Sequence, residues 1–211
     1  LRPVAKPFCN VCGLPLSTFD DLATATCGRC LTKPPPYDMA RYGYYYERSV
    51  RAGITRLKFH SSLFNIRSIG ELLVAAFNTH YSTARFDCII PVPVHRKRLI
   101  GRGFNQVVCL SKRLSQATGI FLDRTALVKC RQTDPQVGLP RSKRLVNLKN
   151  AFGVNHPERI SGKRVLIIDD VSTTGTTVSE VARTLQKAGA AYVAILVVGL
   201  RSRNRPDELD F

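Results

Sequence analysis

The stretch from Lys163 to Thr177 constrains the fold more than any other part of the chain. It begins with a strand-like segment, Arg164 to Ile168, and continues with two carboxylates, Asp169 and Asp170. A short loop rich in hydroxyl groups follows, and then an amphipathic helix whose apolar residues repeat at helical spacing. A strand, a loop and a helix in this order predict one unit of a parallel α/β sheet.

The loop in this stretch has the composition of a phosphate-binding site. In the predicted fold it lies at the carboxyl edge of the sheet, where the helix begins and backbone N–H groups favour an anion. The two carboxylates before it can accept hydrogen bonds from sugar hydroxyls, or hold Mg²⁺ through water. A helix cap and a turn would explain the threonines and aspartates separately, but their combination favours a ligand site. The loop residues are Ser172, Thr173, Thr174, Gly175, Thr176 and Thr177.

The rest of the chain from residue 68 also alternates helical and strand-like segments, as a parallel sheet covered by helices does. We expect Ser68 to cap a helix, and residues 131–147 to form a long mobile loop of the functional kind, because they show no periodicity. The other expected elements are an aromatic strand at 42–46 leading into 50–58, strands at 86–90, 127–130 and 192–198, and helices at 105–117 and from 178 to Gly189.

The net charge of +17 predicts a polyanionic partner. Residues 85–150 carry 14 basic and 3 acidic side chains, which is +11 of that excess. A solvated basic face is the alternative explanation, but tight clusters on predicted loops favour phosphate binding. The two clusters are Arg96, Lys97, Arg98 and Arg102, and then Arg141, Lys143 and Arg144.

Four cysteines form two closely spaced pairs, Cys9 with Cys12 and Cys27 with Cys30. This spacing is typical of a structural zinc site with four thiolates, which leaves no coordination position open for water. Two disulfides or a redox-active pair are the alternatives, but disulfides are not expected without a secretion signal, and a redox-active pair would not need the second pair of cysteines. The remaining cysteines have no partner at such spacing, so we expect them to be buried and inert: Cys88, Cys109 and Cys130.

Three consecutive prolines, residues 34–36, mark a linker. We therefore predict a zinc ribbon and linker at 1–36 and a larger domain at 37–211.

The longest apolar run, residues 190–200, is far shorter than the roughly 20 residues of a membrane helix. The N-terminus does not resemble a secretory signal, so we expect a cytoplasmic protein.

The strand, acid pair and loop at 165–177 resemble the phosphoribosyl pyrophosphate (PRPP) signature of type I phosphoribosyltransferases. Other segments of the chain make the resemblance specific to one family. The four-cysteine ribbon, the segment Pro91-Val92-Pro93 and the segment Arg102-Gly103-Phe104-Asn105-Gln106 together resemble the ComF (ComFC) family of competence proteins. This resemblance covers nearly the whole chain.

The resemblance implies a role for each segment. Asp169 and Asp170 would bind the ribose hydroxyls of PRPP with Mg²⁺, and residues 172–177 would surround its 5-phosphate. The flexible loop 131–147 would close over the site. Pro93, His95, Arg96 and Lys97 correspond to the pyrophosphate loop. Thr173 departs from purine phosphoribosyltransferases, which carry an acidic residue there, so purine salvage is disfavoured.

The family resemblance implies a part in natural transformation, in the uptake and handling of single-stranded DNA, with DNA-processing competence proteins as possible partners. Candidate nucleic-acid contacts are Arg98, Arg102, Arg141, Lys143 and Arg144. Two alternatives stay open: transfer of ribose 5-phosphate from PRPP to an unidentified nitrogen acceptor, and a non-catalytic PRPP sensor.

Overall fold

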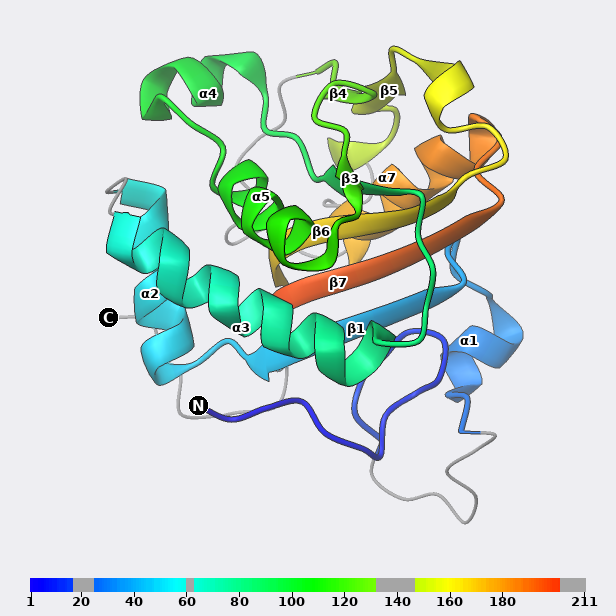
Figure 1. The fold of residues 1–211 in the computed structure, drawn as a ribbon. Coiled ribbons are helices and arrows are strands. Elements are labelled where there is room, and N and C mark those ends of the chain that lie inside the picture. The colour runs from blue at the N-terminus through cyan, green and yellow to red at the C-terminus, as the bar shows by residue number, and fades with distance from the viewer. Residues whose placement is uncertain (17–24, 60–62, 132–146, 202–211) are drawn as a thin grey trace.

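The computed structural model describes residues 1–16, 25–59, 63–131 and 147–201. Its centre is a sheet of five parallel strands in the order β1-β7-β6-β2-β3, which confirms the expected parallel α/β fold (Figure 1). These strands are β1 (Met39–Tyr45), β2 (Cys88–Pro91), β3 (Phe121–Leu122), β6 (Arg164–Ser172) and β7 (Tyr192–Leu200). A separate antiparallel pair consists of β4 (Leu127–Lys129) and β5 (Phe152–Val154).

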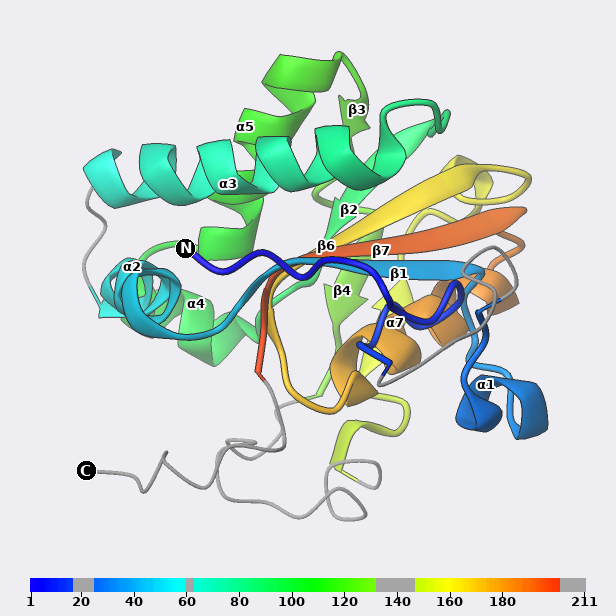
Figure 2. The same ribbon diagram turned by 90° about the horizontal axis from the view of Figure 1, so that it is seen from below.

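Helices cover both faces of the sheet. The helices α3 (Leu63–Tyr81) and α5 (Gln106–Thr118) lie on one face, and α7 (Thr176–Lys187) lies on the other (Figure 2). The remaining helices are α1 (Gly28–Thr32), α2 (Arg48–Phe59), α4 (Arg96–Arg102) and the 3₁₀ helix Pro157–Arg159. Because side chains alternate along a strand, β6 contributes Val165 and Ile167 to the core on the α7 face and Leu166 and Ile168 to the opposite core.

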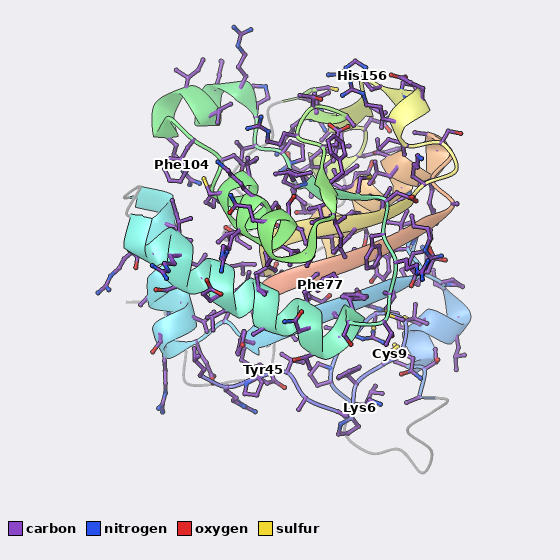
Figure 3. All side chains as sticks on the ribbon, viewed as in Figure 1. Lys6, Cys9, Tyr45, Phe77, Phe104 and His156 are labelled. Carbon is purple, nitrogen blue, oxygen red and sulfur yellow. The ribbon has the colours of Figure 1, made fainter. Side chains whose placement is uncertain are left out.

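The core under α3 is rich in aromatic rings. Figure 3 shows Phe77 between α3 and the sheet, and its ring contacts those of Tyr81 and Phe86. The Tyr81 hydroxyl is buried and donates to the Ile195 carbonyl at 2.9 Å, so the polar end of this ring is paired with β7. These contacts hold α3 on the sheet.

Several predicted boundaries were wrong, among them that of the strand expected at 42–46, which is β1 and runs from Met39 to Tyr45. Ser68 does not cap a helix, because α3 already begins at Leu63 and Ile66 packs against the core one turn before Ile69. The strand expected to end at Ile168 continues to Ser172, because its pairing with β7 continues to the end of that strand at Leu200. Asp169 and Asp170 therefore belong to β6 itself.

The N-terminal segment covers the outer edge of β1 (Figure 2). The Val4 N–H donates to the Gly43 carbonyl at 3.0 Å, and the Tyr45 N–H donates to the Arg2 carbonyl at 2.9 Å. Such pairing protects an edge strand from other chains. The division of the chain near residue 36 stays a prediction, and backbone hydrogen bonds cross it.

Among the described residues, no helix is both long and apolar enough to cross a membrane.

Candidate functional site

The connections of the sheet diverge between β2 and β6, and in open α/β sheets a crevice forms beyond the carboxyl ends of the strands at such a point. From β2 the chain passes through α4 and α5 to β3 on one side, whereas from β6 it passes through α7 to β7 on the other side. Ligands of open α/β sheets bind where the connections diverge in this way, at the carboxyl ends of the strands. The Val92 N–H donates to the Ile168 carbonyl at 2.9 Å, so the segment that follows β2 begins beside β6, which itself continues to Ser172.

The hydroxyl-rich loop leads directly from β6 into α7. Gly175 has a φ of 73°, the left-handed conformation that glycine tolerates best, and this turn places α7 at the end of the strand. The side chains of Ser172 and Thr176 are buried, and the Thr174 and Thr176 hydroxyl oxygens lie 2.6 Å apart. The helix predicted from residue 178 thus begins two residues earlier.

The two carboxylates lie at the same end of β6 and are nearly buried, with exposed fractions of 8% for Asp169 and 6% for Asp170. Neighbouring residues of a strand point to opposite faces, so the two approach the crevice from different sides of the sheet. The Asp170 N–H donates to Asp169 Oδ1 at 2.9 Å, and the Val171 N–H donates to Asp170 Oδ1 at 2.7 Å. Backbone groups therefore orient both carboxylates.

Gln106 is a site residue to which the sequence analysis gave no chemical role. Its Nε2 donates to Asp170 Oδ2 at 3.0 Å, and its Oε1 accepts from Arg102 Nη1 at 3.2 Å. Gln106 belongs to the segment Arg102 to Gln106 that carries the family resemblance, and this is the signal for it in the sequence. Arg102, expected to contact nucleic acid, is thereby connected to Asp170 through this amide.

The basic segment after β2 is helical, which corrects its expected loop conformation. His95 caps α4 because its Nδ1 accepts from the Lys97 N–H at 3.3 Å, and Gly103 ends the helix in a left-handed turn. Arg96 and Lys97 are exposed in the first turn, and Pro93 precedes them on the loop from β2.

Several predicted residues lie outside the described part of the chain. Residues 132–146, which include Arg141, Lys143 and Arg144, belong there, and so does the side chain of Arg98. The flanks of that segment are joined, since Arg131 donates to the Asn147 carbonyl at 2.8 Å.

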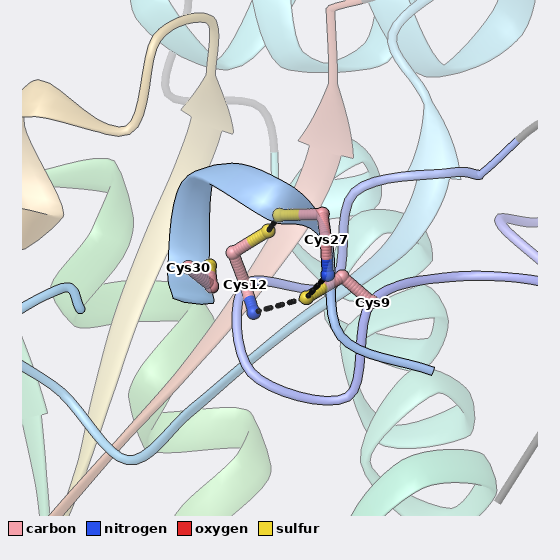
Figure 4. Close-up of side chains that lie close together, drawn as sticks. All are labelled: Cys9, Cys12, Cys27 and Cys30. Atoms are coloured by element: carbon pink, nitrogen blue, oxygen red, sulfur yellow. Dashed lines mark hydrogen bonds between the residues drawn. The ribbon is translucent and has the colours of Figure 1, made fainter. Parts of the chain in front are cut away.

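The four paired cysteines form one cluster (Figure 4). Their sulfur atoms all lie within 4.8 Å of one another, so together they could hold a metal ion such as zinc. The Cys9 sulfur accepts from the Cys27 N–H at 3.3 Å and from the Cys12 N–H at 3.5 Å. Burial raises the pKa of the Cys9 thiol, but these N–H groups outweigh it and lower the pKa to about 7. Burial raises the pKa of Cys12 to about 11.

The other three cysteines differ from one another. Cys88 is buried as expected, and burial raises its pKa to about 12. Cys109 is half-buried, and Cys130 is exposed, so the expectation that all three are buried was wrong. Cys130 directly follows β4, which pairs with β5 outside the main sheet.

A basic groove of about 460 Å³ lies between α3 and α5. Arg67 and Lys112 line it and are exposed. Arg113 also lines it and pairs with Glu71, with 2.7 Å between Nη2 and Oε1. The groove contributes positive charge on the face of the sheet opposite to α7.

Two curated proteins are similar to this chain over most of their length. The DNA utilization protein YhgH of Escherichia coli strain K12 is 36% identical over 193 residues, which are 90% of this chain and 82% of that protein. Competence protein F of Haemophilus influenzae is 32% identical over 194 residues, which are 90% of this chain and 82% of that protein.

The family model described as "Phosphoribosyl transferase domain" matches residues 112–210. Among solved structures, adenine phosphoribosyltransferase from Thermoanaerobacter pseudethanolicus is 17% identical, with a TM-score of 0.42 over 65% of this chain and 69% of that chain. The identity to the curated proteins and the share that they cover establish the family: the chain belongs to the ComF family, together with Competence protein F and YhgH, and contains a phosphoribosyltransferase-type domain.

Proposed function

We propose that this chain binds PRPP in the crevice between β2 and β6 and serves a ComF-like role in competence and DNA utilization. One observation carries the first half of this proposal: where the sheet connections diverge, β6 ends in a buried acid pair and a hydroxyl-rich loop, and Gln106 links Asp170 to Arg102 of the basic helix α4. The relatives' names support the second half.

Each part of PRPP has a matching group in this arrangement. The 5-phosphate would lie against residues 172–177 at the positive end of α7. The ribose hydroxyls would donate to Asp169 and Asp170, which accept as carboxylates. Arg96 and Lys97 supply positive charge for the pyrophosphate. Oxygen ligands of this kind suit Mg²⁺, which would neutralise the pyrophosphate when bound.

The test is calorimetric titration of PRPP with Mg²⁺ into the purified chain and into the variant Asp169→Asn/Asp170→Asn. We expect the wild-type chain to bind and the variant to lose binding while its circular dichroism spectrum is unchanged, because the amides keep the volume and lose the charge. The control Glu158→Gln removes an exposed carboxylate of the 3₁₀ helix Pro157–Arg159, outside β6 and the loop that follows it. Equal affinity of the acid-pair variant and the wild type would place the ligand elsewhere.

We also propose that the four cysteines hold a structural zinc ion. Four thiolates match the tetrahedral preference of zinc, and the N–H groups directed at the Cys9 sulfur stabilise its charged form. Elemental analysis of the purified chain is expected to give one zinc per molecule, and a chain without bound metal would contradict this assignment.

The DNA-handling part of the proposal rests on the net charge and on the groove between α3 and α5. Binding of a single-stranded oligonucleotide by phosphate contacts should weaken steeply with salt. The variant Arg67→Gln/Lys112→Gln should weaken it and reduce the salt slope, whereas the matched control Lys163→Gln/Lys187→Gln should not. Equal affinities of the two variants for the oligonucleotide would show that the groove does not bind it. A cytoplasmic location is part of the same proposal.

A transfer reaction is the second candidate, and the match to the phosphoribosyltransferase family model favours it. An acceptor nitrogen would attack C1 of the ribose, the C1–O bond would break, and pyrophosphate would leave. Thr173 offers a hydroxyl where a carboxylate would serve a purine base. Release of pyrophosphate from PRPP when a nitrogen acceptor is added would establish the reaction. Binding of PRPP without release of pyrophosphate, whichever acceptor is added, would instead favour a non-catalytic PRPP sensor.

A further inference from the structure

We propose that Gln106 is a positioning residue of the ligand site, whose amide holds the Asp170 carboxylate and the Arg102 guanidinium in one hydrogen-bonded chain. This inference rests on the proposed PRPP site and specifies how its carboxylate is oriented. It also gives a physical role to the segment from Arg102 to Gln106, which the proposed function leaves without one.

The partners of Gln106 fix the orientation of its amide. A carboxylate can only accept and a guanidinium can only donate, so Nε2 must face Asp170 and Oε1 must face Arg102. The side chain is only 4% exposed, so water is a poor substitute for either partner. A glutamate at this position would repel Asp170, and an apolar residue would satisfy neither neighbour.

Both oxygens of Asp170 are held. Oδ1 accepts from the Val171 N–H and Oδ2 accepts from Gln106, so the carboxylate plane is fixed from two sides. A carboxylate held in this way is already oriented when a ligand hydroxyl arrives, and the cost of ordering it on binding is reduced.

The surrounding segment anchors Gln106 to the crevice. Gly103 ends α4 with a φ of 78°, and Asn105 caps α5 by accepting from the Val107 N–H at 3.0 Å. The Asn105 Nδ2 also donates to the Val92 carbonyl at 3.2 Å. The segment therefore joins the loop after β2, the start of α5 and the end of β6, which are the elements around the proposed site.

The first arm of the test measures PRPP affinity by calorimetry with Mg²⁺ present. The variants Gln106→Met and Gln106→Glu should each bind PRPP at least about tenfold more weakly than the wild type, because a hydrogen bond to a charged group is lost. The controls Gln116→Met and Gln116→Glu make the same changes at an exposed position of α5 and should stay within about twofold of the wild type. Unchanged affinity in both Gln106 variants would overturn the inference.

The second arm needs no ligand. Gln106→Glu should lower the midpoint of thermal unfolding, and the exchanged pair Gln106→Glu/Asp170→Asn should recover most of it, because the amide and the carboxylate have changed places. Failure of the exchanged pair to recover the midpoint would show that the two side chains do not interact as described. If the wild-type chain binds no PRPP while the exchange restores stability, the proposed function fails and the contact between the two residues stands.

Discussion

At the scale of single residues, the candidate site is held by side chains from distant parts of the chain. Gln106 and Asp170 are 64 positions apart and meet at 3.0 Å. The acid pair and the loop could be predicted from sequence because they are contiguous in it. The role of Gln106 could not, because only the packing of α5 against β6 brings its amide to the carboxylate.

Thr176 offers a test of the loop at this scale. Its hydroxyl lies 2.6 Å from that of Thr174, and its side chain is buried. Thr176→Val should cost about 1 kcal/mol of unfolding free energy and weaken PRPP binding about tenfold, because a polar partner in the loop is lost. Thr184→Val, which removes a hydroxyl bonded to the Glu180 carbonyl in the same helix, should affect stability alone. Urea unfolding and calorimetry measure the two quantities.

Asp123 governs part of the pH dependence of stability. Burial raises the pKa of this carboxyl, but the N–H groups of Thr125 and Ala126, the Thr125 hydroxyl and Arg159 outweigh it and hold the pKa below the ordinary 3.8. A lowered folded pKa adds stability that is complete above the unfolded pKa and is lost as the pH falls through the folded one. Asp123→Asn should therefore flatten the stability profile below about pH 4. Identical profiles for the variant and the wild type in urea unfolding would disprove this.

At the scale of elements, the sequence predicts the type of an element better than its ends. The helix expected at 105–117 is α5, with Asn105 as its cap and Gly119 as its end. In contrast, β6 is longer than expected because tertiary pairing with β7 extends it. The segment at 96–102 is helical because a local cap from His95 and the turn at Gly103 define it, and both signals are weak in the sequence alone.

Gly13 shows how closely the cysteine-bearing segment approaches β1. A Cβ at this position would lie 2.2 Å from the Ala40 carbonyl oxygen, and φ is 67°. Gly13→Ala should therefore destabilise the fold by about 2 kcal/mol or more, through overpacking and backbone strain together. Gly119→Ala has a similar φ of 73° with open space around it, so it should cost only about 1 kcal/mol. Chemical unfolding of both variants measures the difference, and equal costs would contradict the close approach.

At the scale of the whole molecule, the cysteine cluster and the sheet share one core. Cys9, Cys12 and Cys30 belong to the same group of buried residues as Ile167 and Ile195. Arg41 on β1 also donates to the Asn10 carbonyl at 2.9 Å. The parallel fold and the presence of a cysteine cluster were predictable from periodicity and spacing. The packing of the cluster against β1 was not, because sequence spacing gives no information about which strand lies at the edge.

Removal of the metal should therefore affect the whole chain. With a zinc chelator, we expect one cooperative thermal transition at a lower midpoint, because loss of the ion loosens residues that pack directly on the sheet. Circular dichroism at several wavelengths checks whether the transition is single. Two separate transitions would instead show that residues 1–36 and 37–211 unfold independently.

We propose that one chain combines a PRPP site with a role in DNA handling. The most direct measurement is titration of PRPP with Mg²⁺ into the wild-type chain, with and without a short single-stranded oligonucleotide. We predict PRPP binding in both cases, with an affinity that the oligonucleotide changes, which gives the coupling free energy between the two ligands. Oligonucleotide binding without any PRPP binding would contradict the claim and leave the fold as a nucleic-acid platform.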